Sequence, residues 1–315
     1  MDDVESIRAG FWRRILGFLI DGIVLGLTGI ALGTSLYDEL ANLAGPTRLI
    51  GLAIGAVYFG VTTSAIGGSR TLGMRVTGLK VVSVKGGPLS LPTALWRAIL
   101  LQAPFMLNGM IVSLTDPVWL KLYGVVVGTI VFGAGLAQIL LLFFNRASGR
   151  LVHDLLSGAA VVRVEARTAP ERDARGAMVA AGLAVFVSFA AMAGLTQYGS
   201  KFLPEPLTTM SASREAVMTV PTVLGAWVQD NTMTNLSGAG RQTTRTLIVT
   251  AKLRTWPDEP QALADQVGAA ALSRYKLAPG QRVRVVLSRG YDIGIAQASN
   301  SRTLDYQPPA ARPST

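Results

Sequence analysis

The first apolar run of the chain extends from Phe11 to Ser35, which is long enough for a helix that crosses a membrane. Four more runs follow, at about Leu49–Ile66, Ala94–Leu114, Trp119–Phe144 and Gly176–Tyr198. Each approaches or exceeds the ~20 apolar residues that a bilayer core requires. Polar segments with glycine, proline and charged residues separate these runs. The pattern therefore predicts five membrane-spanning helices.

Two polar segments beside these runs carry strand signals. Val76–Val84 alternates between apolar and polar positions and ends at a glycine turn, and Val161–Val164 alternates more weakly. Asp116 and Pro117 indicate a short turn between the third and fourth runs. We expect the two strands to pair with each other.

The chain after the fifth run has the pattern of a small folded domain. Two segments alternate with a period of two, which predicts half-buried strands with Leu247, Val249, Ala251 and Leu253 facing inward in one, and Val283, Val285 and Leu287 in the other. Between them, a helix is expected from Asp258 to about Tyr275. This order predicts a β–α–β unit, with a further strand at Ala216–Val220 and a disordered tail from Gln307.

Composition favours a membrane protein over a soluble enzyme. Half of the residues are hydrophobic, only 15% are charged, and the mean hydropathy is +0.41. The chain has one histidine and no cysteine, which excludes disulfides, thiolate metal sites and cysteine nucleophiles. We therefore expect no enzyme activity, no cofactor and no bound metal. The net charge of +10 is explained by arginines beside membrane spans, so nucleic acid is not an expected partner.

The positive charges also predict an orientation. Lysine and arginine gather before the first run, around Arg70–Arg97 and in Arg146–Arg175, whereas the other loops have only Arg48 and Lys121. Because cytoplasmic loops carry the excess of such residues, the amino terminus is expected in the cytoplasm and the carboxy-terminal domain outside it. The predicted location is the inner membrane of a bacterial cell, with several spans.

Asp21 is anomalous because it lies inside the first apolar run. A carboxylate at that depth costs on the order of 2.5–3.5 kcal/mol on insertion scales, so it must face the bundle interior, pair with a cation or take up a proton. Arg14, seven residues earlier on nearly the same helix face, and Arg97, at the entry of the third run, are the expected partners. Both a structural ion pair and a proton or cation site remain open.

Other polar residues in the runs suit helix packing. Gln102, Asn108 and Gln138 are expected to form hydrogen bonds between helices. Pairs of glycines four residues apart allow close helix contacts: Gly22/Gly26, Gly29/Gly33, Gly51/Gly55 and Gly124/Gly128.

His153 and Asp154 follow the fourth run, at the predicted cytoplasmic surface. Pairing of the two strands would bring them near Arg70 and Arg75, so that Asp154 anchors an arginine. The His153 imidazole could then titrate near neutral pH.

Several of these motifs, in the same order, resemble the RDD family of bacterial membrane proteins, which is named for one arginine and two aspartates. Arg14 (or, in a less favoured register, Arg13) matches the arginine, Asp21 the first aspartate, and Asp154 in Val152–Leu155 the second. Arg70–Val82 matches the segment after the second helix of the family. The resemblance covers about Arg8–Val164 and implies a four-span bundle and a transport role.

The expected architecture is an all-α transmembrane bundle with a small α+β extracytoplasmic domain. It divides into an RDD-like four-helix domain (1–165), a linker with the fifth span (166–199), the outer domain (200–306) and the tail (307–315). Two functions are considered. One is transport of a small cation or solute, perhaps coupled to protons, by a homo-oligomer in the lipid bilayer. The other is a membrane anchor or adaptor whose outer domain, through an exposed loop at Gly290–Asp292, binds a protein or cell-envelope partner.

Overall fold

A computed structural model of the chain describes residues 9–43, 46–110, 117–145, 149–166, 175–202, 205–237 and 240–308. The predicted turn at Asp116 and most of the predicted tail lie outside these ranges. The chain forms two compact units. Unit 1 comprises Met1–Ser35, Gly45–Tyr198 and Asp292–Gln297, and unit 2 comprises Leu36–Ala44, Gly199–Tyr291 and Ala298–Thr315.

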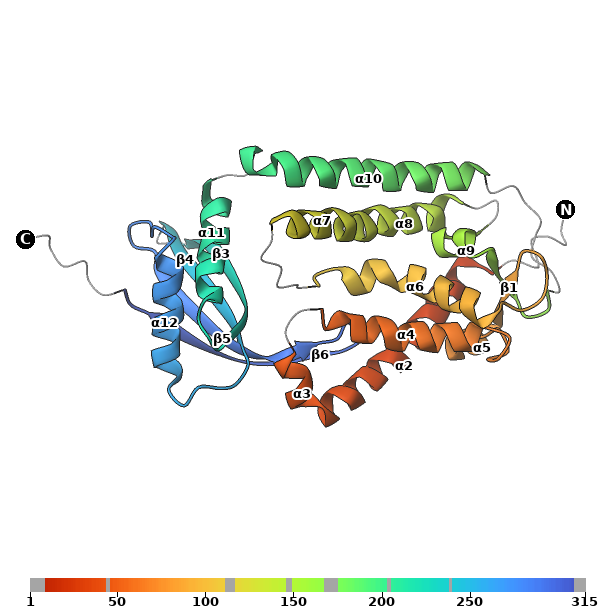
Figure 1. The fold of residues 1–315 in the computed structure, drawn as a ribbon, viewed down its shortest axis with the longest axis horizontal. Coiled ribbons are helices and arrows are strands. Elements are labelled where there is room, and N and C mark those ends of the chain that lie inside the picture. The colour runs from red at the N-terminus through yellow and green to blue at the C-terminus, as the bar shows by residue number, and fades with distance from the viewer. Residues whose placement is uncertain are drawn as a thin grey trace, which may run out of the picture. The chain divides into compact units, whose positions relative to one another are not determined.

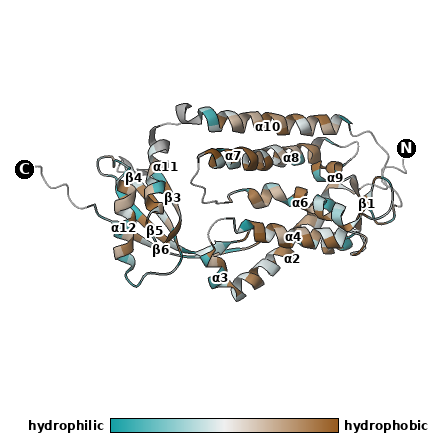
Figure 2. Cartoon of the chain, in the orientation of Figure 1, coloured by the Kyte–Doolittle hydropathy of each residue, from teal (hydrophilic) through white to brown (hydrophobic). Residues whose placement is uncertain are grey.

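Unit 1 is built from apolar helices, which are largely brown in Figure 2. They are α2 (Phe11–Ser35), α4 (Arg48–Thr63), α6 (Leu91–Leu107), α7 (Pro117–Gly128), the π-helix η1 (Thr129–Ala134), α8 (Gly135–Phe144) and α10 (Arg175–Phe202) (Figure 1). Three stretches of the described chain are long and apolar enough to cross a membrane: Phe11–Ser35, Val118–Phe143 and Arg175–Tyr198. The apolar helices α4 and α6 are shorter, at 16 and 17 residues. The predicted helical region is confirmed.

Short elements cover one end of these helices: α5 (Leu72–Thr77), β1 (Leu79–Ser83), α9 (Val152–Leu156) and β2 (Ala159–Arg163). Strands β1 and β2 pair antiparallel, as predicted. The predicted strand began too early, because residues 72–77 form a helix. The Thr71 side chain caps this helix by accepting a hydrogen bond from the Met74 amide, and Gly78 ends it at a φ of 68°.

The α10 helix packs against the fourth apolar stretch. A methyl group added to Gly128 would lie 2.6 Å from the sulfur of Met192, and one added to Gly133 would lie 3.2 Å from Cα of Val185. Glycine therefore lets the two backbones approach closely. The α10 helix is thus part of the bundle rather than only a tether.

Unit 2 is a four-stranded sheet with helices. Its elements are α3 (Tyr37–Asn42), α11 (Glu205–Met218), β3 (Val223–Ser237), β4 (Gly240–Leu253), α12 (Pro260–Leu272), β5 (Arg282–Asp292) and β6 (Gln297–Tyr306). The strand order is β3-β4-β5-β6, with β3 and β4 antiparallel and β4 and β5 parallel. The β4–α12–β5 crossover confirms the predicted β–α–β unit, and all seven inward-facing residues predicted for its strands are buried.

Two predictions for unit 2 are wrong. The segment predicted as a strand at Ala216–Val220 lies at the end of α11 and in the turn after it, and the edge strand β3 follows it. Gly290 and Tyr291 are not an exposed loop, because they are buried residues of β5. A methyl group on Gly290 would lie 2.1 Å from the carbonyl oxygen of Ala298, so this position packs tightly.

Candidate functional site

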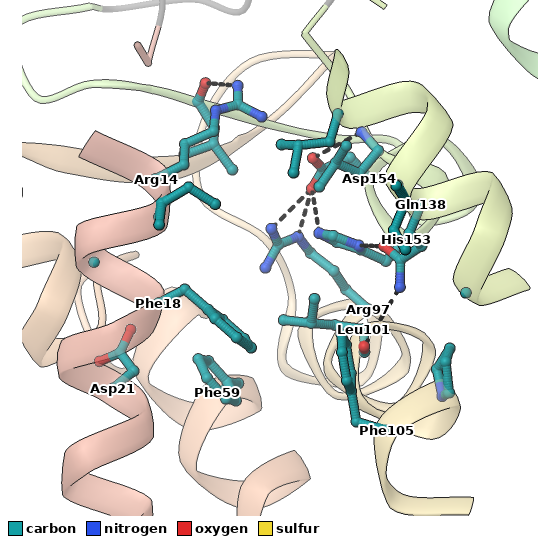
Figure 3. Close-up of a pocket in the computed structure, with 18 of the residues that line it drawn as sticks. Arg14, Phe18, Asp21, Phe59, Arg97, Leu101, Phe105, Gln138, His153 and Asp154 are labelled. Carbon is teal, nitrogen blue, oxygen red and sulfur yellow. Dashed lines mark hydrogen bonds and ion pairs between the residues drawn. The ribbon is translucent and has the colours of Figure 1, made fainter. Parts of the chain in front are cut away.

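A cavity of about 600 Å³ lies inside unit 1. Its walls come from α2, α4, α6, η1, α8 and the elements at the helix ends, and most of its lining is apolar. Figure 3 shows Arg14, Arg97, Gln138, His153 and Asp154 in the upper part of the view and Phe18, Phe59 and Phe105 below them, with Asp21 beside Phe18 and Phe59. Seven of the ten polar residues singled out in the sequence line this cavity: Arg14, Asp21, Arg97, Asn108, Gln138, His153 and Asp154.

Asp21 is buried and accepts three hydrogen bonds. Its Oδ1 accepts from the Tyr58 hydroxyl at 2.7 Å and the Gly73 amide at 2.8 Å, and its Oδ2 accepts from the Thr71 hydroxyl at 2.6 Å. Each hydroxyl oxygen also accepts a backbone amide, Thr71 from Met74 and Tyr58 from Leu72. These contacts satisfy the first amides of α5 and hold this helix on α2.

The predicted arginine partners of Asp21 are wrong. Among the described residues, Arg97 pairs with Asp154, and the Arg14 guanidinium donates to the backbone carbonyls of Gly149, at 2.5 Å, and Val161, at 3.1 Å. Arg14 therefore connects the start of α2 by hydrogen bonds to strand β2 and to the segment that precedes α9. The sequence could not show this, because backbone carbonyls leave no signal in the residue pattern.

Arg97, Asp154 and His153 form a buried cluster. The Nε and Nη2 atoms of Arg97 lie 2.9 and 2.8 Å from Oδ1 of Asp154, and the His153 Nε2 lies 3.5 Å from the same oxygen. The other oxygen of Asp154 accepts from the Leu151 amide at 3.3 Å, at the start of α9. Asp154 does anchor an arginine, but this arginine is Arg97 rather than Arg70 or Arg75.

Gln138 connects this cluster to a break in α6. Pro104 has no amide hydrogen, so the carbonyl of Leu100 lacks its helical partner, and the Gln138 Nε2 lies 3.5 Å from that oxygen and 3.4 Å from the Leu101 oxygen. The Oε1 of Gln138 therefore faces Nδ1 of His153, at 2.5 Å, and the imidazole donates. The prediction that Gln138 forms hydrogen bonds between helices is confirmed, because it joins α8 to α6.

The environment separates the charge states of the two neighbours on α9. Burial lowers the pKa of the His153 imidazole to about 4, against the opposing effect of Asp154, so this side chain is neutral at pH 7. Burial opposes ionisation of Asp154, but His153 and the Arg97 guanidinium lower its pKa to about 2. The expected titration of His153 near neutral pH is therefore wrong.

The remaining predicted residues lie away from this cluster. Gln102 is buried and its Nε2 donates to the Ala98 carbonyl of its own helix at 3.1 Å. Asn108 caps the end of α6, and its carbonyl accepts from Arg48. Arg75 is exposed and donates to the Gly67 carbonyl, while the Arg70 side chain forms no hydrogen bond with the part of the chain that is described.

Sequence reasoning missed Tyr58, Thr71 and Gly73, the partners of Asp21. Thr71 carried a helix-start signal, since it precedes an apolar segment that ends at Gly78. For metals, no group of three or more potential ligands occurs among the described residues. The arrangement can enclose a small molecule with an apolar body against a polar, charged end.

Comparison with known proteins agrees with the residue pattern. The model of the RDD family matches residues 8–158. The uncharacterised protein YxaI of Bacillus subtilis (strain 168) is 32% identical over 127 residues, which cover 33% of this chain and 79% of that protein. No solved structure matches the chain.

Proposed function

The chain belongs to the RDD family of membrane proteins, and from this premise we propose that unit 1 transports a small cation or solute through its cavity. The observation that carries the proposal is the cavity of about 600 Å³ with a buried charged end. This volume lies in the range of about 300–1,000 Å³ that is typical of small-molecule sites. A scaffold that only packs helices needs no such space.

Two irregular helices support movement of a solute. Pro104 interrupts the hydrogen bonds of α6, and the π-helix η1 contributes Val131 and Phe132 to the cavity. Gly135, the residue after η1, lies against Pro104, with 3.6 Å from the Pro104 Cβ to a methyl group placed there. Non-helical backbone at membrane depth occurs where it lines a cavity, and π-bulges are frequent at functional sites.

In this proposal, Asp21 has a structural role and the coupling proton belongs to His153. Three donors, two hydroxyls and one backbone amide, already occupy the Asp21 carboxylate, which leaves little room for exchange of a cation there. His153 lines the cavity and is neutral at pH 7, and it takes up a proton only as the pH falls toward its pKa of about 4, so coupling through it would be strongest in acid. The protein would lie in the inner membrane as a homo-oligomer, with its amino terminus in the cytoplasm.

Flux through reconstituted protein tests the proposal. Liposomes that contain the purified full chain and an internal pH dye receive gradients of Na⁺, K⁺ or Li⁺. The change in internal pH is expected to exceed that of empty liposomes. Leu136→Trp, which fills the cavity, should reduce the rate of this change about tenfold or more. Val126→Trp is the matched control, because Val126 is 47% exposed, as Leu136 is, but does not line the cavity. No response from the full chain with any of the three cations would contradict cation transport.

A role as an anchor or adaptor is the second candidate, and the folded core of unit 2 favours it. This core contains Leu247, Val249, Val283, Val285 and Leu287, and transport alone does not require it. Crosslinking in native membranes should then capture a distinct protein or cell-envelope component that is lost when Thr208–Thr315 is deleted. Recovery of this chain alone would contradict the adaptor role.

A further inference from the structure

The cavity of unit 1 changes from charged to apolar along its length. On α6, Arg97, Leu101 and Phe105 are spaced four residues apart and all line it, so they form a single stripe from the second turn of the helix toward its end. On α2, Arg14 precedes Phe18 in the same way. The cluster of Arg14, Arg97, His153 and Asp154 therefore lies nearer the starts of both helices, and a phenylalanine follows one turn after Arg14 on α2 and two turns after Arg97 on α6.

The apolar part of the cavity is open to the surroundings of the helices. Phe105 is 57% exposed and Phe132 is 60% exposed, although both line the cavity. Both belong to apolar helices of the bundle, so exposed rings at these positions suit contact with the hydrocarbon of a bilayer. A ligand can thus enter sideways from the membrane with its apolar body.

The charged end offers a hydrogen-bond donor that is not used within the protein. Arg97 is 2% exposed, and Asp154 engages its Nε and Nη2. Its Nη1 donates to none of the residues that the structure describes, and Figure 3 shows the third guanidinium nitrogen directed away from Asp154. A buried guanidinium edge of this kind binds oxygen acceptors, with phosphate and carboxylate the best matched.

We infer that the cavity binds a single-chain amphiphile with a phosphate or carboxylate head, which lies at Arg97 while its chain follows the stripe to Phe105. The size of the cavity suits one chain rather than a complete two-chain phospholipid. The inference deepens the proposed function by naming the class of solute, and it depends on that function only for the transport step.

Photocrosslinking tests this inference. The full chain, in nanodiscs of phosphatidylcholine, is irradiated with dodecyl phosphate that carries a diazirine at the end of its chain. Crosslinks are expected on peptides of α6 and η1–α8 that line the cavity. Unlabelled dodecyl phosphate should compete, whereas dodecyltrimethylammonium and inorganic phosphate should not, because one has the wrong head and the other has no chain.

Two variants and one control locate the site. Arg97→Lys keeps a cation for Asp154 but removes the fork of donors, and should reduce labelling about fivefold. Leu136→Trp fills the apolar part and should reduce it about tenfold. Val126→Trp should label like the unmodified chain. If Arg97→Lys does not fold, Leu136→Trp with Val126→Trp still decides the outcome.

Other results overturn the inference. Crosslinks spread over all lipid-facing helices, α10 included, would show only contact with the bilayer. Competition by inorganic phosphate would show a site for a free anion. If the unmodified protein is a dimer and Leu136→Trp dissociates it, a second copy of the chain covers the cavity. Labelling without flux in the liposome assay would contradict transport and leave the amphiphile site standing. Cation-driven flux without labelling would support transport and contradict the amphiphile site.

Discussion

At the scale of single residues, the acid inside the first span is an acceptor of hydrogen bonds. The Asp21 carboxylate receives two hydroxyl groups and one backbone amide, all from the chain between Tyr58 and Gly73. A buried carboxylate can be stabilised by donors as well as by a cation. Arg14, Asp21 and Asp154, which the sequence pattern matches to the arginine and aspartates of the RDD name, thus each attach a short element at one end of the helices.

Removal of this acceptor should loosen α5. Asp21→Asn retains one oxygen for the three donors, so we expect unfolding to become easier by about 1–3 kcal/mol, as for buried donors that lose their partner. Thr71→Val should act in the same direction. Because both changes affect the same contact, the double variant should cost less than the sum. Thermal unfolding in detergent measures all three, and additive effects would contradict the direct contact.

Burial of neutral His153 predicts a pH dependence. The unfolded chain has an ordinary histidine pKa of about 6.5, whereas the pKa in the fold is about 4, so protons bind the unfolded state more strongly. The stabilisation, about 3 kcal/mol, is complete above pH 6.5 and is lost as the pH falls toward 4.

Unfolding temperatures between pH 7.5 and 4.5 measure this loss. His153→Gln should flatten the curve over that window. A curve for the variant as steep as that of the unmodified chain would contradict the assignment to His153.

At the scale of elements, close backbone contacts replace side-chain packing where α5 meets α2. A methyl group on Gly73 would lie 2.0 Å from the carbonyl oxygen of Gly17, which belongs to α2. By contrast, a methyl group on Gly22, also in α2, would meet nothing within 4 Å. Glycine pairs in a sequence therefore do not all mark contacts.

The two glycines should respond oppositely to the same change. Gly73→Ala forces α5 away from α2 and should destabilise unit 1 by about 1–3 kcal/mol, as overpacking does. Gly22→Ala should be neutral or stabilise by up to about 1 kcal/mol, because alanine is the better helix former. Denaturation midpoints of the two variants provide the comparison. Equal destabilisation by both would argue against the close contact.

At the scale of the whole molecule, unit 1 is not continuous in sequence. It includes Asp292–Gln297, between β5 and β6, and the Asp292 carboxylate accepts from the Arg48 Nη2 at 2.7 Å. A methyl group on Gly51 would lie 2.0 Å from the Ile293 carbonyl oxygen, so this segment packs directly on α4.

Truncation after Tyr198 should therefore destabilise unit 1, although it leaves the apolar helices intact. The cause is loss of the Arg48 partner and of the packing around Gly51. A chain that ends after Tyr306 is the control and should unfold like the full chain. Unfolding temperatures in detergent decide the matter. Identical values for all three chains would show that the segment contributes nothing.

The spans could be predicted because each is a long apolar run, and the β–α–β unit because buried positions alternate along its strands. Phe11–Ser35 shows the first pattern in the bundle, and Leu247, Val249 and Val283 show the second in the sheet. The partners of Asp21 could not be predicted, since an amide such as that of Gly73 is present in nearly every residue and only the tertiary fold selects one. The same holds for η1, where the sequence pattern of an α-helix and that of a π-helix do not differ.

The chemical reactivity of single cysteines tests most directly whether the cavity is a site rather than packed interior. The chain contains no cysteine, so each introduced thiol is the only one. Leu101→Cys lines the cavity on α6, whereas Ala98→Cys, one turn earlier, lies in the packed core. In native membranes we predict that a small thiol reagent modifies Leu101→Cys readily, that dodecyl phosphate slows this reaction, and that Ala98→Cys stays unmodified. Equally slow modification at both positions would contradict the cavity as a binding site.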